Sequence, residues 1–162
     1  MNCNCYFGYG SNLNLADFDR YCLAKGFAGG GLRAVGPAIL EGYRLAFSHY
    51  SNARGGGALN LQRDDQHCVS GVLFTVDTAE TWQVLDLKEG HPQRYQKTLV
   101  RVRVSSGETP SAATYIVERP KAAYFRPTDD YVRIVAAGLE AFGLCTRALH
   151  AAASPIPMPG SP

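Results

Sequence analysis

The stretch YFGYGSNL, at residues 6–13, joins a predicted first strand to a predicted first helix. Residues 5–7 are apolar and β-favouring, and Gly8 and Gly10 flank Tyr9 where the strand must end. Glycine lacks a Cβ, so it permits positive φ and lets a ligand approach the backbone. Side chains that cap helices follow, and apolar residues then recur at helical spacing. Such a strand, turn and capped helix start leave N–H groups free, which favours a small anionic ligand.

A purely structural role for this turn is the competing interpretation. GYGSNL begins like the dinucleotide fingerprint G-x-G-x-x-G, but Leu13 occupies the position of the third glycine. No second βαβ unit follows, so a dinucleotide site is not predicted. Taken alone, a strand-to-helix turn of this kind more often serves the fold than a ligand.

The composition predicts a globular chain without a nucleic-acid or membrane partner. The 162 residues are 46% hydrophobic and 19% charged, which fits one domain over residues 1–150. Residues 151–162 are rich in proline, and we expect a disordered tail there. The net charge is only +2, and no apolar run approaches the ~20 residues that span a bilayer. Because the N-terminus lacks the regions of a signal peptide, we expect a cytoplasmic protein.

Neither a metal nor an organic cofactor is predicted. The five cysteines are scattered and odd in number, which indicates free thiols. Cys3 and Cys5 form a C-x-C pair, but no second pair completes a zinc pattern. The glycine-rich residues 26–31 are not followed by Gly-Lys-Ser or Gly-Lys-Thr, so they do not form a phosphate-binding P-loop.

Periodicity predicts a mixed α/β (α+β) domain in which short strands outnumber helices. Turns are expected at Glu41–Gly42 and at residues 63–66. A helix opens at Asp77 with Glu80 as its capping-box partner and ends at Gly90; another is capped by Thr128 and ends at Gly143. Strands are predicted at residues 5–7, 33–40, 43–49, 58–62, 69–76, 95–104 and 113–117. A sheet or barrel with a few flanking helices is the expected architecture.

Glu89, in LDLKEGHP, is the strongest candidate for an acid–base group. It stands at the end of a predicted helix, whose negative pole disfavours a carboxylate, and burial would raise its pKa in the same direction. Lys88 and Arg94 would oppose that rise. A carboxyl group with a raised pKa can act as a general base and acid near neutral pH. Taken alone, a glutamate before a C-terminal glycine is usually a solvated surface residue.

The two motifs together resemble the γ-glutamylcyclotransferase family, including its butirosin-biosynthesis and γ-glutamylamine branches. The resemblance runs from Tyr6 to about Leu149. YFGYGSNL is similar to the family's substrate loop, which usually has alanine at the position of Gly8, and LDLKEG is similar to its LD-x-x-EG segment. GPAILEGYRLAF, GGGALN, SGVLFTV, the TY of ATYIV and PTDDYVRIVAAGLEAFGL also match the family pattern.

The resemblance implies a small β-barrel with flanking helices and a cofactor-free reaction. The α-amine of a γ-glutamyl group attacks its own γ-carbonyl, which releases 5-oxoproline and an amine or amino acid. Glu89 aligns with the family's catalytic glutamate and would move the proton. Backbone N–H groups of the loop would bind the α-carboxylate or the oxyanion, and Tyr115 matches a substrate-contacting tyrosine. The expected substrate-binding residues are Tyr9, Gly10, Ser11, Asn12, Leu13, Tyr95, Tyr115 and Tyr131.

Two other functions are compatible with the sequence. The first is a non-catalytic module that binds a small ligand on the same fold, although such a module would not need Glu89. The second is a cyclotransferase for a γ-glutamylated amine or secondary metabolite. Glutathione is less favoured, because glutathione-specific cyclotransferases have a different loop signature. We expect residues 50–57 and 121–127 to lie on the leaving-group side; the sequence does not identify that group or the oligomeric state.

Overall fold

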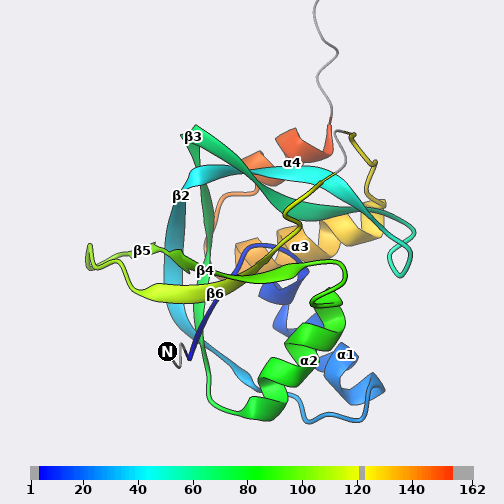
Figure 1. The fold of residues 1–162 in the computed structure, drawn as a ribbon, viewed down its shortest axis with the longest axis vertical. Coiled ribbons are helices and arrows are strands. Elements are labelled where there is room, and N and C mark those ends of the chain that lie inside the picture. The colour runs from blue at the N-terminus through cyan, green and yellow to red at the C-terminus, as the bar shows by residue number, and fades with distance from the viewer. Residues whose placement is uncertain (1–3, 121–122, 155–162) are drawn as a thin grey trace, which may run out of the picture.

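A computed structural model describes residues 4–120 and 123–154 of the chain (Figure 1). In chain order the elements are β1 (Cys5–Gly8), the 3₁₀ helix η1 (Ser11–Leu13), α1 (Leu15–Ala24), β2 (Leu32–Ser51), β3 (Gly56–Val76), α2 (Ala79–Glu89), β4 (Gln96–Arg101), β5 (Arg103–Val104), β6 (Ser111–Ile116), α3 (Asp129–Ala141) and α4 (Arg147–Ala153). Among the described residues, no helix is long and apolar enough to cross a membrane.

The strands form one six-stranded sheet in the order β4-β6-β1-β3-β2-β5. The β1–β6 pair is parallel, and the other pairs are antiparallel. The long β2–β3 hairpin curls around β1, β4 and β6, and the helices flank this half-barrel (Figure 1). The predicted mixed α/β (α+β) fold, a small β-barrel with flanking helices, is therefore confirmed, with the sheet curled into a half-barrel. Residues 69–76 of β3 are central as expected.

The predicted turns at Glu41–Gly42 and residues 63–66 are wrong. Both stretches lie inside the continuous strands β2 and β3, and the register shifts between Glu41 and Tyr43. Gly42 has φ +77°, and opposite it Asp64 accepts a hydrogen bond from the Gln66 N–H (3.1 Å). The turn-forming residues therefore make an irregular bulge that bends the hairpin, and the chain does not reverse there.

The start of one helix differs from the prediction, the start of another agrees with it, and a further helix was not predicted. α2 is capped by Thr78, whose hydroxyl accepts from the Thr81 N–H, and Asp77 pairs with Arg33 instead of capping. The predicted Thr128 cap of α3 is confirmed by its bond from the Tyr131 N–H (3.2 Å). Helix α4 was not predicted, and it includes residues 151–153 of the expected disordered tail. Residues 155–162 of that tail, and Cys3, lie outside the described residues.

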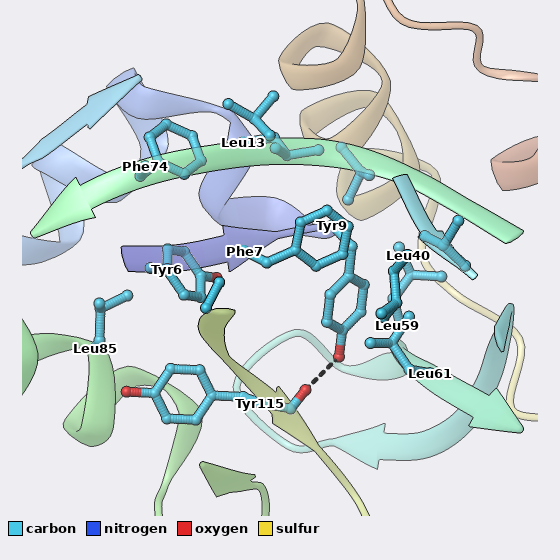
Figure 2. Packing of buried hydrophobic residues seen from close by; sticks show 14 of the residues in the cluster. Tyr6, Phe7, Tyr9, Leu13, Leu40, Leu59, Leu61, Phe74, Leu85 and Tyr115 are labelled. Atoms are coloured by element: carbon cyan, nitrogen blue, oxygen red, sulfur yellow. Dashed lines mark hydrogen bonds between the residues drawn. The ribbon is translucent and has the colours of Figure 1, made fainter. Parts of the chain in front are cut away.

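The hydrophobic core anchors both ends of the glycine turn. Phe7 of β1 and Phe74 of β3 are fully buried, and Leu13 at the end of η1 is 1% exposed (Figure 2). Full burial of such side chains contributes about 1.5–3 kcal/mol each. Helix α3 packs against the same turn at Gly138, where an added Cβ would lie 2.6 Å from the Asn14 nitrogen. The turn is therefore held between the sheet and α3.

Candidate active site

Glu89 lies where an open cleft meets a small inner cavity. The cleft has a volume of about 510 Å³ and lies between α1, the end of α2 and the β2–β3 turn. The inner cavity has a volume of about 30 Å³ and is lined mainly by tyrosines and by residues of the glycine turn. Ser11, Glu89, Tyr95 and Tyr131 line both spaces. A ligand in the cleft can therefore reach the Glu89 carboxyl group and the turn together.

The environment of Glu89 raises its pKa above the ordinary value for a glutamate. Burial is the largest cause, and it is opposed by the charge of Lys88, by a hydrogen bond from Asn12, and by the charges of Arg54 and Arg94. The Asn12 Nδ2 donates to Oε1 at 2.9 Å. Among the described residues none donates to Oε2, so this oxygen can accept a proton from a ligand. Glu89 thus has the properties of a general base.

Asn12 is fixed in one orientation by three hydrogen bonds. Its Nδ2 donates to Glu89 and to the Tyr6 hydroxyl (3.0 Å), while its Oδ1 accepts from the Lys88 ammonium (2.6 Å). Because the ammonium can only donate, it keeps the amide oxygen on its own side. Lys88 also donates to the Ser11 hydroxyl (3.0 Å). The predicted residues Ser11 and Asn12 are thereby tied to the end of α2.

A small charged network supports Lys88. Its side chain is only 8% exposed, and burial lowers its pKa, whereas the charges of Glu89 and Asp17 oppose that lowering. Asp17 of α1 lies 4.0 Å from the ammonium and accepts a hydrogen bond from Arg54 (3.0 Å). The sequence did not indicate Asp17 or Arg54 as site residues, since these partners are far apart in the chain.

The four predicted tyrosines surround the inner cavity together with Tyr6, which was not predicted. Tyr9 donates to the Tyr115 carbonyl (2.6 Å; Figure 2), and Tyr95 donates to the Leu59 carbonyl (2.7 Å). The Tyr115 hydroxyl donates to Asp86 (2.6 Å), so its oxygen lies away from the Tyr9 hydroxyl. These three hydroxyl protons are committed to protein acceptors.

Tyr6 and Tyr131 differ from the other tyrosines because their hydroxyl oxygens act as acceptors. Tyr6 accepts from Asn12, and Tyr131 accepts from the Leu59 N–H (3.3 Å). Burial raises the pKa of Tyr131 to about 12 and that of Tyr6 further. Both therefore stay protonated near neutral pH, and among the described residues no acceptor takes their protons. These two hydroxyls can donate to a ligand in the inner cavity.

The backbone of the glycine turn offers fewer donors than the sequence predicted. The Leu13 N–H donates to the Gly10 carbonyl (3.1 Å), and the Leu13 side chain belongs to the core. The N–H groups of Gly10, Ser11 and Asn12 make no hydrogen bond within the described part of the chain. Three backbone donors are thus available beside Glu89.

The two loops expected on the leaving-group side contact each other, since the Gly57 N–H donates to the Arg126 carbonyl (2.8 Å) and the rings of Tyr50 and Phe125 lie 5.9 Å apart. Ser51, Ala53 and Arg54, from the first loop, line the cleft. In the second loop, residues 121–122 lie outside the described residues, and Phe125 lines a neighbouring cavity of about 550 Å³. His49 and Arg94 line both the cleft and this neighbouring cavity.

Comparison with known proteins identifies the family. No curated protein sequence matches the chain. The chain is similar to a solved structure named gamma-glutamyl cyclotransferase, with 20% identity, a TM-score of 0.77, and coverage of 98% of this chain and 90% of the other. The uncharacterized protein loc79017 from Homo sapiens is 22% identical, with a TM-score of 0.76 and coverage of 100% of this chain and 93% of the other. YkqA from Bacillus subtilis is 24% identical, with a TM-score of 0.72 and coverage of 93% of this chain and 52% of the other.

The TM-scores show that these proteins share the fold of this chain, and at such low sequence identities they show nothing more. The family assignment comes from the sequence. The family model described as gamma-glutamyl cyclotransferase, AIG2-like, matches residues 6–133, which include both motifs and Glu89. The resemblance inferred from YFGYGSNL and LDLKEG is therefore confirmed. The chain belongs to the AIG2-like gamma-glutamyl cyclotransferase family, and it is a cyclotransferase enzyme.

Proposed function

We propose that the protein converts a γ-glutamyl compound into 5-oxoproline and a free amine or amino acid. In this reaction the α-amine of the γ-glutamyl unit forms a bond to its own γ-carbonyl carbon, and the bond from that carbon to the leaving nitrogen breaks. The α-amine loses a proton and the leaving nitrogen gains one, so the reaction is balanced without an oxidant, a metal or a second substrate. The prediction that no cofactor is needed comes from the sequence, which has neither a complete metal-ligand pattern nor a phosphate-binding loop, and it agrees with this balance.

Glu89 is the proposed general base and acid. A free α-ammonium group has a pKa of ~8 and becomes nucleophilic only after it loses a proton. The observation that carries the proposal is the state of the Glu89 carboxyl group: Asn12 holds Oε1, Oε2 is open, and burial raises the pKa. A carboxyl group whose pKa is raised holds the proton more readily than an ordinary glutamate, so it can act as the general acid that returns this proton to the leaving nitrogen.

The γ-glutamyl unit is proposed to bind at the glycine turn and the tyrosines, with the leaving group in the cleft. The Gly10, Ser11 and Asn12 N–H groups and the spare hydroxyl protons of Tyr6 and Tyr131 are donors for the α-carboxylate and the oxyanion. Holding the flexible chain bent also favours cyclisation, since oriented groups reach effective molarities of ~10⁵ M or more. Tyr9, Tyr95 and Tyr115 contribute ring surface to this pocket in the proposal.

Glu89→Gln tests the proposal directly. The amide is nearly isosteric with the carboxyl group but cannot accept the proton, so turnover should fall by about 10²–10⁴-fold. Release of 5-oxoproline from a panel of γ-glutamyl amines and amino acids is the assay. Glu140→Gln, at an exposed position of α3, is the matched control and should keep the parent rate.

The same experiment separates catalysis from a ligand-binding function. A binding module would bind a γ-glutamyl compound without turnover, and Glu89→Gln would then change binding only. A folded Glu89→Gln variant with the parent rate would exclude Glu89 as the base. The cytoplasmic location expected from the sequence stays a prediction, and fractionation of the source cells would test it.

A further inference from the structure

We propose that Arg94 is a specificity-determining residue that binds a carboxylate on the leaving group. The enzyme would accordingly prefer γ-glutamyl amino acids, which leave with a free carboxylate, over compounds with a neutral or cationic leaving amine. This inference rests on the proposed function, because it assumes that the γ-glutamyl unit is bound at Glu89.

The position of Arg94 supports this role. Its N–H donates to the Gly90 carbonyl (2.9 Å), and its guanidinium group packs on Gly90, the residue after Glu89. Gly90 has φ +65°, and a Cβ there would overlap the Arg94 Nε and lie 2.7 Å from Cζ. Since glycine has no side chain, the guanidinium can lie directly beside the end of α2 that carries Glu89.

Arg94 is also exposed and unpaired. It borders both the cleft and the neighbouring cavity, and within residues 4–120 and 123–154 no acidic group forms an ion pair with it. Apart from Glu89, the acidic residue of the cleft is Asp17 of α1, which is already paired with Arg54. The Arg94 guanidinium therefore has its full set of donors available for a ligand, and its planar fork matches a carboxylate.

The chemistry of the reaction brings the leaving carboxylate to this place. Glu89 must come within hydrogen-bond distance of the leaving nitrogen to return the proton. In an α-amino acid the carboxylate carbon is only two bonds from that nitrogen. A guanidinium that packs on the residue after Glu89 is thus on the same side of the site as this carboxylate.

The overall charge of the cleft favours the same class of leaving group. Five cationic side chains line it, against the two acidic side chains of Asp17 and Glu89. The γ-glutamyl unit brings one ammonium and one carboxylate, so it leaves this excess of positive charge uncompensated. An anionic leaving group complements the excess, whereas a polyamine would be repelled. The cationic residues are Arg20, Lys25, Arg54, Lys88 and Arg94.

Paired substrates test the proposal. γ-Glutamylalanine and γ-glutamylalaninamide differ only in the leaving carboxylate, and 5-oxoproline release gives kcat/KM for each. We expect the parent to prefer the acid, and Arg94→Gln to lower kcat/KM for the acid by about 10- to 100-fold with little change for the amide. Arg94→Lys should restore part of the loss. Arg101→Gln, whose side chain donates to Thr109 outside the cleft, is the matched control.

Two results would overturn the role of Arg94. One is an equal effect of Arg94→Gln on both compounds. The other result requires a third compound, in which the glutamyl α-carboxylate of γ-glutamylalanine is replaced by an amide. If Arg94→Gln leaves kcat/KM unchanged for this compound but lowers it for γ-glutamylalaninamide, Arg94 binds the α-carboxylate of the glutamyl unit and not the leaving group.

A binding measurement keeps this inference distinct from the proposed function. If the parent releases no 5-oxoproline from any compound, titration calorimetry with γ-glutamylalanine decides. Binding that Arg94→Gln weakens, and weakens less for the amide, supports Arg94 while refuting the reaction. Absence of binding to the parent overturns both proposals.

Discussion

Replacing Gly138 by alanine should displace the glycine turn without replacing any residue of the candidate site. The added Cβ would lie 2.6 Å from the Asn14 nitrogen, 2.7 Å from the Leu13 carbonyl carbon and 2.8 Å from the Leu13 Cβ. Ordinary contacts begin near 3.4 Å, so α3 and the turn must separate by about 0.8 Å. Two of the three atoms belong to the backbone, which no side-chain rotation can move aside.

The expected effect is larger on activity than on stability. Overpacking of this kind costs about 1–3 kcal/mol, and removing a glycine from a helix interior offsets about 0.5–1 kcal/mol of it. The displaced turn carries Ser11 and Asn12, and Asn12 holds the Glu89 carboxyl group. A shift of about 1 Å in a catalytic arrangement can cost ~10²-fold. We therefore expect kcat/KM to fall by about 10- to 100-fold, with a net loss of stability near 1 kcal/mol.

Ala137→Gly on the exposed face of α3 is the control for this variant. It should lose about 0.5–1 kcal/mol in urea unfolding and keep the parent kcat/KM for 5-oxoproline release. The comparison isolates the displacement of the turn from a general loss of stability. Parent-like kcat/KM in Gly138→Ala would refute the argument that α3 positions the turn.

Two further predictions concern the ionisation of Glu89. Because the folded protein raises the pKa of Glu89, kcat/KM should fall with decreasing pH through a value above the ordinary ~4.3. For the same reason, the free energy of unfolding should decrease as the pH rises from ~4.3 through the raised pKa. Glu89→Gln should therefore unfold at a higher urea concentration than the parent at pH 7, and a parent-like midpoint would contradict this. Lys88→Met removes the charge that lowers the Glu89 pKa and frees the Asn12 amide, so the acid limb of the pH–rate profile should move to higher pH; an unmoved limb would exclude the coupling.

Local chemistry was sufficient to predict the parts of the site that are close in sequence. The glycine turn, the Gly90 end of α2 and the Thr128 cap of α3 each depend on a few neighbouring residues, and the structure has all three. Burial and the opposing charges of Lys88 and Arg94 also act on the Glu89 pKa in the predicted directions. Helix ends and their charges can be read from sequence because their partners lie within one turn.

Long-range partners explain what the sequence could not predict. Gly42 and residues 63–66 have turn chemistry, and only the pairing of β2 with β3 makes them a bulge within a continuous hairpin. Tyr6 has the pattern of a buried strand residue, and its contact with Asn12 depends on the path of the turn. The Asp17–Arg54 ion pair joins α1 to the β2–β3 turn, and the spacing of residues along the sequence does not predict it.

The meeting of the narrow inner cavity and the wide cleft at Glu89 has a consequence for the order in which products depart. Under the proposed binding mode, the lactam forms at the tyrosine-lined inner end, and the released amine or amino acid lies between it and solvent. The amine must then leave first, and 5-oxoproline follows through the space that it vacates. In steady-state kinetics, 5-oxoproline should inhibit competitively against the substrate and the amine noncompetitively; competitive inhibition by the amine alone would show that the lactam has its own exit.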